Sequence, residues 1–110
     1  MTTPEGKVKD AIKVVLDKFK VYYDMPVTWG MAKRGVDFHC IVRGPHGYAM
    51  AFYIEAKRPG KDATLLQYDF MKTRQEEQGA AWFVIDNHTE IANLAKWLEA
   101  NERACAVSNG

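Results

Sequence analysis

Two acidic residues and a lysine carry the strongest chemical signal in this sequence. Glu55, Ala56 and Lys57 end an apolar run that begins at Tyr48 and is typical of a buried strand. Because side chains alternate along a strand, Glu55 and Lys57 share one face and Ala56 lies on the other. Asp37 belongs to the preceding predicted strand. Together these groups predict a site for a cation and a phosphate, typical of a metal-dependent phosphodiesterase.

The expected metal follows from the two carboxylates. Two ionised carboxylates about 4 Å apart repel by roughly 4 kcal/mol at an effective dielectric constant near 20. A divalent cation turns this repulsion into attraction, and oxygen ligands with water favour Mg²⁺ or Mn²⁺ over zinc. We predict Asp37 and Glu55 as metal ligands, with the carbonyl of Ala56 and the carboxylate of Glu5 as further candidates. Lys57 would orient the attacking water or stabilise the transition state.

The elements that must position these groups form a small mixed sheet flanked by helices, an α/β fold in the order α-β-β-β-α-β-α. The chain predicts one domain over residues 1–104 and a flexible tail over 105–110. The first expected element is a helix capped by Thr2 or Thr3, with an inward stripe from Val8 to Phe19. A weak strand at 27–29 and strands at 36–43 and 48–57 follow, and then a helix from about Thr64 to Gly79 with Leu66 and Phe70 inward. The last expected elements are a buried parallel strand at 80–86 and a helix at about 89–101, whose inward residues are Ile91, Leu94, Ala95 and Leu98.

The metal site also fixes the register of the predicted hairpin. Opposed residues in an antiparallel pair have a constant sum of residue numbers, which must be 92 if Asp37 lies opposite Glu55. A four-residue loop over 44–47 would pair Arg43 with Tyr48 and place the two acids on opposite faces. We therefore predict an odd-length loop, or a bulge between the turn and the site.

Composition narrows the class of protein. The 110 residues are 47% hydrophobic, which suits one core, and no run of about 18 apolar residues predicts a membrane span. Cys40 and Cys105 are too few for a disulfide framework and lack zinc-type spacing, so a reducing cytoplasm is expected. Residues 1–74 hold 13 basic and 8 acidic residues, whereas 75–110 hold 2 and 6. The positive portion contains the predicted site, which favours a polyanionic partner.

These residues resemble a known family pattern over nearly the whole chain. Glu5 in a helix, Arg34 to Asp37 (Arg-Gly-Val-Asp), Ile54 to Lys57 (Ile-Glu-Ala-Lys) and helical Gln67 are similar in order to the PD-(D/E)XK nuclease superfamily, specifically its small VRR-NUC branch. One departure is Val36, where the family often has proline.

The resemblance implies a restriction-endonuclease-like core and a metal-dependent, structure-selective DNA endonuclease. The catalytic residues it implies are Asp37, Glu55, Lys57 and Gln67, with Mg²⁺ or Mn²⁺ as cofactor. Small members resemble phage Holliday-junction resolvases, which implies a homodimer acting on branched DNA, in the host cytoplasm if the chain is phage-encoded. The basic residues expected to contact nucleic acid are Lys33, Arg34, Arg58 and Lys61.

Other interpretations of the same residues stay open. Thr64 and Gln67 fit a T-x-x-Q capping box, which is compatible with a catalytic role for Gln67. Glu5 also suits a helix dipole, and Glu55 with Lys57 also suits an exposed pair at a strand end. The alternative for the whole protein is a catalytically inactive nucleic-acid-binding module of the same fold, although none of the three central residues is missing. A small interaction protein with an accidental charged strand end is the remaining class.

Overall fold

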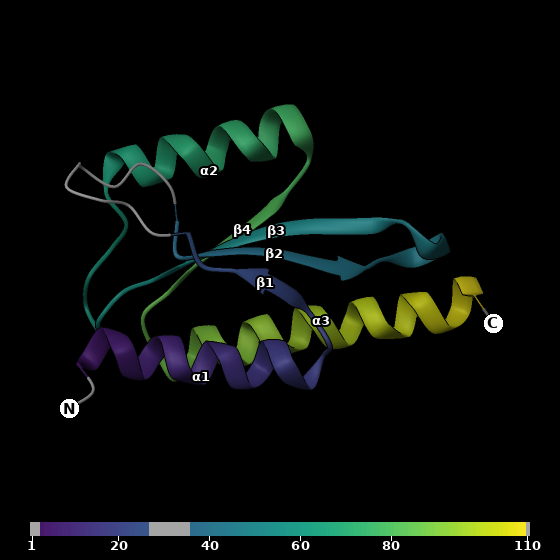
Figure 1. Cartoon of the computed structure of the whole chain (residues 1–110), viewed down its shortest axis with the longest axis horizontal. Helices are drawn as coiled ribbons and strands as arrows, with labels where there is room; N and C mark the ends of the chain where they lie inside the picture. Colours follow the sequence, from purple (N-terminus) through teal and green to yellow (C-terminus); the bar gives the residue numbers. More distant parts are fainter. Residues whose placement is uncertain (1–2, 27–35, 110) are drawn as a thin grey trace.

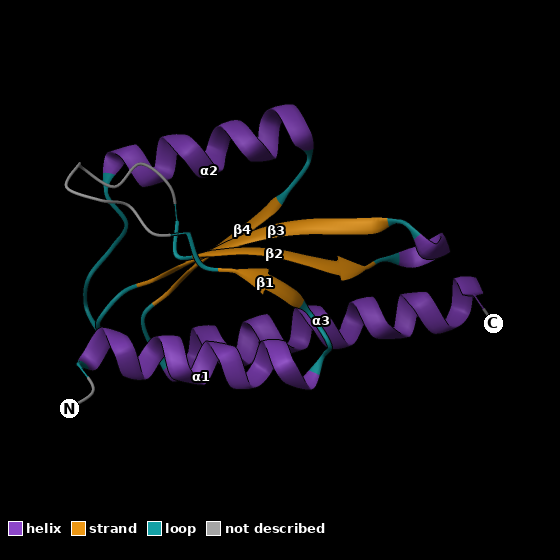
Figure 2. Ribbon diagram, in the orientation of Figure 1, coloured by secondary structure: helices purple, strands orange, loops and turns teal. Residues whose placement is uncertain are grey.

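The computed structural model describes residues 3–26 and 36–109, which form three α-helices on the two faces of a four-stranded sheet (Figure 1 and Figure 2). The elements are α1 (Pro4–Lys18), β1 (Tyr22–Asp24), β2 (Phe38–Arg43), the 3-10 turn η1 (Pro45–Gly47), β3 (Ala49–Ala56), α2 (Leu65–Gln78), β4 (Ala81–Ile85) and α3 (His88–Asn109). The strand order is β1-β2-β3-β4, with β4 parallel to β3 and the other pairs antiparallel. The predicted element order and mixed sheet are confirmed.

The hydrophobic core lies between the sheet and the helix pair α1 and α3, whereas α2 covers the opposite face (Figure 1). Thr3 caps α1 by accepting a hydrogen bond from the amide of Gly6 at 3.0 Å. Alternate residues of β2 and β3 point into the core, and burial raises the pKa of the Cys40 thiol to about 12. Cys40 is therefore a neutral packing residue. The buried set includes Val8, Ile12, Leu16, Phe38, Cys40, Val42, Phe52, Ile54, Ala56, Leu94 and Leu98.

The β2–β3 hairpin has the register that the predicted metal site requires. Phe38 pairs with Ile54 and Arg43 with Ala49, so the residue numbers sum to 92. The connection is the five-residue segment 44–48, which contains η1. His46 and Gly47 adopt left-handed backbone with φ of 62° and 79°, which turns the chain tightly enough for this odd-length loop. The predicted odd-length loop is confirmed.

Three expectations need correction, one for the inward face of α2 and two for the edge strands of the sheet. Leu66 is 45% exposed, and α2 instead buries Gln67 and Met71. β4 is an edge strand of the sheet, so Ile85 is its one fully buried residue. A strand not expected from the sequence, β1, pairs with β2, while the strand expected at 27–29 lies outside the described residues.

The end of the chain is helical where a flexible tail was expected. α3 continues to Asn109 because its last turns contact the hairpin turn. The side-chain amide of Asn101 donates to the carbonyl oxygen of Arg43 at 2.9 Å, and the Ser108 hydroxyl accepts from the amide of His46 at 3.1 Å. None of the helices in the described ranges combines the length and apolar character needed to cross a membrane.

Candidate active site

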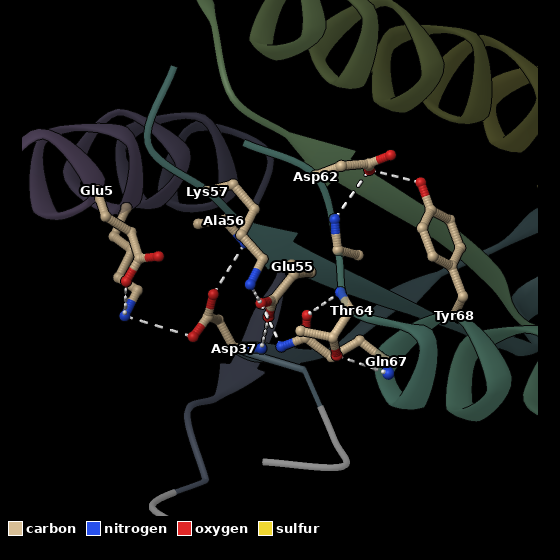
Figure 3. Close-up of polar contacts among 11 residues, drawn as sticks. Glu5, Asp37, Glu55, Ala56, Lys57, Asp62, Thr64, Gln67 and Tyr68 are labelled. Atoms are coloured by element: carbon tan, nitrogen blue, oxygen red, sulfur yellow. Dashed lines mark hydrogen bonds and ion pairs between the residues drawn. The ribbon is translucent and has the colours of Figure 1, made fainter. Parts of the chain in front are cut away.

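Asp37 and Glu55 lie side by side at the end of the hairpin remote from its turn (Figure 3). Extending the register by one residue from Phe38 and Ile54 places Asp37 opposite Glu55, on the sheet face opposite the core. Their exposed fractions are 6% and 1%. Because a buried carboxylate is costly unless its charge is compensated, the groups around this pair determine what it can do.

Each acid is held by the backbone of the strand opposite. The amide of Asp37 donates to Glu55 Oε1 at 3.1 Å, and the amide of Ala56 donates to Asp37 Oδ2 at 2.8 Å. Hydrogen bonds from rigid backbone donors to a carboxylate are strong and fix its orientation. This reciprocal bracing offsets part of the repulsion between the two acids and holds them in one geometry. It also brings the amide of Ala56 to the site, whereas the role of its carbonyl as a metal ligand stays a prediction.

Lys57 completes the predicted triplet. Its Nζ lies 3.0 Å from Glu55 Oε2, and its side chain is 16% exposed. The pair is therefore largely buried, which contradicts the alternative of an exposed pair at the strand end. An ammonium group held here compensates the charge of Glu55 and still has access to solvent.

Gln67 makes two connections with one amide group. Its Nε2 donates to Glu55 Oε2, and its Oε1 accepts from the amide of Thr64 at 2.9 Å. Thr64 Oγ1 in turn accepts from the amide of Gln67 at 3.2 Å, which completes a capping box at the start of α2. The structure thus places Gln67 both in the helix cap and against the site.

Glu5 reaches the site through Lys9, a residue that sequence reasoning missed. Lys9 Nζ lies 3.5 Å from Glu5 Oε2 and 3.3 Å from Asp37 Oδ1 (Figure 3). The two residues are one turn apart on α1, so their spacing predicts the ion pair but not its contact with β2. Glu5 is 43% exposed, in contrast to the two buried acids.

The loop after Lys57 carries two of the four residues expected to contact nucleic acid. Arg58 and Lys61 are exposed there, whereas Lys33 and Arg34 lie outside the described residues. Hydrogen bonds of Gly60 and Asp62 anchor the same loop to the residue after β4 and to α2. The amide of Gly60 donates to Asp86 Oδ2 at 3.1 Å, and the Tyr68 hydroxyl donates to Asp62 Oδ1. This last bond lowers the pKa of the Asp62 carboxyl and raises that of the Tyr68 hydroxyl.

His39 lies on the same sheet face as the acids but belongs to an aromatic cluster. Its ring centroid is 5.1 Å from that of Tyr53 and 6.1 Å from that of Phe70. Burial lowers the pKa of the imidazole, with Arg74 adding to this effect and Asp24 opposing it. Among the described residues its Nε2 is buried without a hydrogen-bond partner. These ring contacts of His39 are therefore with aromatic side chains and not with Asp37 or Glu55.

The acidic side chains at the site determine which ion it could hold. Within 3–26 and 36–109, no group of three or more His, Cys, Asp or Glu side chains is arranged to hold a metal. Mg²⁺, however, usually keeps several waters and is bound through one or two carboxylates. Asp37 and Glu55 supply two such groups in a fixed orientation. The residues therefore fit a hydrated Mg²⁺ or Mn²⁺ better than an ion enclosed entirely by protein.

Comparisons of the sequence with known proteins identify no family for this chain. No family model matches the chain, and no curated protein is significantly similar to it in sequence. The resemblance to the VRR-NUC branch therefore rests on the residues themselves. Of these, the structure gathers Asp37, Glu55, Ala56, Lys57 and Gln67 in one place, with Glu5 linked through Lys9.

Proposed function

We propose that this protein is a metal-dependent endonuclease that hydrolyses phosphodiester bonds of branched DNA such as Holliday junctions. The observation that supports this best is the pair of buried, mutually braced carboxylates with an ammonium group 3.0 Å from one of them. Buried charged groups are often no more stabilising than well-packed apolar residues. Their presence in a sheet otherwise built around an apolar core favours a chemical role.

The roles of the chain's own groups follow from their contacts. Mg²⁺ or Mn²⁺, when bound, would polarise the scissile phosphate and lower the pKa of a bound water. Asp37 and Glu55 present acceptor oxygens whose positions are already fixed, so little reorganisation accompanies the reaction. Lys57 offers N–H donors where negative charge grows on the phosphate. Gln67 is a positioning residue, because its contact with Glu55 restrains that carboxylate.

The preference for branched DNA rests on the family resemblance and on where the basic residues lie. Arg58 and Lys61 are exposed in the loop that directly follows Lys57. Contacts of such side chains with phosphates position DNA without reading its sequence. Symmetric cutting of a four-way junction needs two sites related by a twofold axis, so we propose a homodimer. Sedimentation at micromolar concentration tests this, and a strict monomer with and without DNA would contradict it.

A second candidate is an inactive nucleic-acid-binding module of the same fold. The observation that favours it is that each oxygen of Asp37 and Glu55 already has a protein donor, at 2.8 to 3.3 Å. A network of this kind can be purely structural. Such a module would bind DNA without responding to Mg²⁺ or Mn²⁺ at this position.

The decisive experiment is cleavage of matched four-way-junction, flap and linear duplex substrates of equal length, with Mg²⁺ or Mn²⁺ and with chelator. We expect cleavage that requires the metal and prefers the junction. The control is Glu55→Ala protein purified in parallel, which reveals any contaminating nuclease. Equal cleavage by wild type and Glu55→Ala, or binding without cleavage under all conditions, would reject the proposed activity.

A further inference from the structure

Lys9 contacts one of the two acids that are predicted to hold the metal ion. Its Nζ lies between Glu5 Oε2 at 3.5 Å and Asp37 Oδ1 at 3.3 Å. An ammonium group between two carboxylates supplies one positive charge, half of what a divalent ion would supply. The contact involves Oδ1, whereas Oδ2 of Asp37 is held by the amide of Ala56 on the other side. Lys9 therefore covers the side of Asp37 that faces α1.

The described partners of Asp37 and Glu55 differ in how easily they move. The amides are backbone groups, that of Ala56 in β3 and that of Asp37 directly before β2, and Gln67 is fixed by its capping box. Lys9 instead has a long flexible side chain that is 28% exposed. Solvent is already available to receive its ammonium group. Among these contacts, that between Lys9 and Asp37 is the one most readily given up.

The charges of the ionised groups at the site also favour release of Lys9 when a divalent ion binds. Glu5, Asp37 and Glu55 with Lys9 and Lys57 sum to one net negative charge. Adding a divalent ion reverses the sign and leaves one net positive charge, which weakens the hold on a nearby ammonium group. It also suits a phosphodiester, whose single negative charge would bring the sum to zero.

We propose that Lys9 is a built-in counter-ion, which compensates Asp37 in the metal-free protein and is displaced when a divalent ion binds. The inference rests on the metal site of the proposed function. It means that Lys9 competes with the ion and raises the ion concentration at which the site fills. It also means that Lys9 stabilises the metal-free fold, since Asp37 would otherwise be a buried acid with less compensation.

The test uses the whole chain and Mn²⁺ alone, with free Mn²⁺ measured by electron paramagnetic resonance. Lys9→Met removes the charge and keeps most of the length and the flexibility of the side chain. Lys9→Arg keeps the charge, and Lys13→Met, one turn further along α1, controls for a general loss of positive charge. We expect Lys9→Met to bind Mn²⁺ about tenfold more tightly, within the usual range of coupling between two ligands of one site. Lys9→Arg and Lys13→Met should bind no more tightly than wild type.

Thermal unfolding gives a second readout that needs no substrate. Lys9→Met should melt below wild type without Mn²⁺, and saturating Mn²⁺ should close the gap. Unchanged or weaker Mn²⁺ binding by Lys9→Met overturns the inference. If wild type binds Mn²⁺ and Asp37→Ala does not, the metal site of the proposed function still stands. Mn²⁺ binding that survives Asp37→Ala removes that metal site, and the inference with it. Absence of Mn²⁺ binding by both wild type and Lys9→Met also overturns both.

Discussion

The two ends of the β2–β3 hairpin are held in opposite ways. At the turn, Arg43 at the end of β2 and His46 in η1 are exposed, and hydrogen bonds with Asn101 and Ser108 tie them to α3. At the other end, Asp37 and Glu55 are buried and braced by each other's strand. The turn sets the register, and the far end uses it to bring two acids together. Changes at the turn should therefore affect stability alone, whereas changes at the far end should affect chemistry first.

The largest expected effect is that of Asp37→Ala, which removes a predicted metal ligand. We expect cleavage to fall by at least about 10³-fold, since metal assistance supplies several kcal/mol of transition-state stabilisation. Single-turnover rates at saturating Mg²⁺ measure it. Asp37→Asn, which keeps the shape and a carbonyl acceptor for the amide of Ala56, should lose as much activity while melting closer to wild type. Activity within tenfold of wild type would mean that Asp37 is only structural.

Lys57→Ala should give the next largest effect. We expect turnover to slow by about 10²-fold, because one donor to the developing negative charge is lost. Mn²⁺ and DNA binding should persist, since neither acid is removed. Lys72→Ala is the matched control, because Lys72 is an exposed lysine of α2 with no proposed role at the site or in DNA binding. Equal rates for the two variants would remove Lys57 from the chemistry.

Substitution of Gln67 separates its two contacts. Gln67→Leu loses both the capping box and the bond to Glu55, and we expect a loss of about 1–2 kcal/mol in the free energy of unfolding. Gln67→Glu keeps a capping-box residue but places a second carboxylate against Glu55. Chemical denaturation compares them with Thr64→Ala, which weakens the cap alone. If all three lose equal stability and retain full cleavage, Gln67 acts only as a cap.

At the turn, Gly47→Ala should cost about 1 kcal/mol of stability, because Gly47 has a φ of 79° that other residues adopt with strain. Cleavage should be unchanged once the variant is folded. His46→Gly should shift stability the other way, because His46 has a φ of 62°. A loss of cleavage in folded Gly47→Ala would show that the two ends of the hairpin are not separable.

The smallest effect concerns the loop that follows the site. Tyr68→Phe removes the hydrogen bond that lowers the pKa of Asp62, so that pKa should rise toward its ordinary value. A lowered folded-state pKa contributes stability above the unfolded pKa, which is lost as pH falls through the folded pKa. Wild type should therefore lose slightly more stability on acidification than Tyr68→Phe. Carboxyl NMR titration measures the pKa, and no difference between the proteins would contradict the assignment.

Local patterns were sufficient to predict much of the fold and the centre of the site. Alternation along β3 placed Glu55 and Lys57 on one face, and the demand that Asp37 meet Glu55 gave the correct register. The T-x-x-Q spacing gave the capping box of α2. These features depend on neighbours in the sequence or on one hairpin. The role of the site in catalysis stays a prediction.

The features that were missed depend on contacts between distant elements. Lys9 enters the site only because α1 lies against the start of β2. The last turns of α3 are stable because Asn101 and Ser108 meet the hairpin turn, which no helix propensity reveals. The inward face of α2 was misassigned because its position nearest Glu55 is taken by the polar Gln67 rather than by Leu66.

The double use of Gln67 links the behaviour of a helix end to that of the site. Its amide oxygen secures the first turn of α2, and its amide nitrogen secures Glu55. Fraying of that turn therefore also removes one of the contacts that hold Glu55, which couples the opening of the helix end to the order of the carboxylate. Hydrogen exchange at the amides of Gln67 and Tyr68, which are bonded to Thr64, then reports on the order of the acid pair. Any ligand that tightens Glu55 should slow exchange there, so the start of α2 serves as an intrinsic sensor of occupancy.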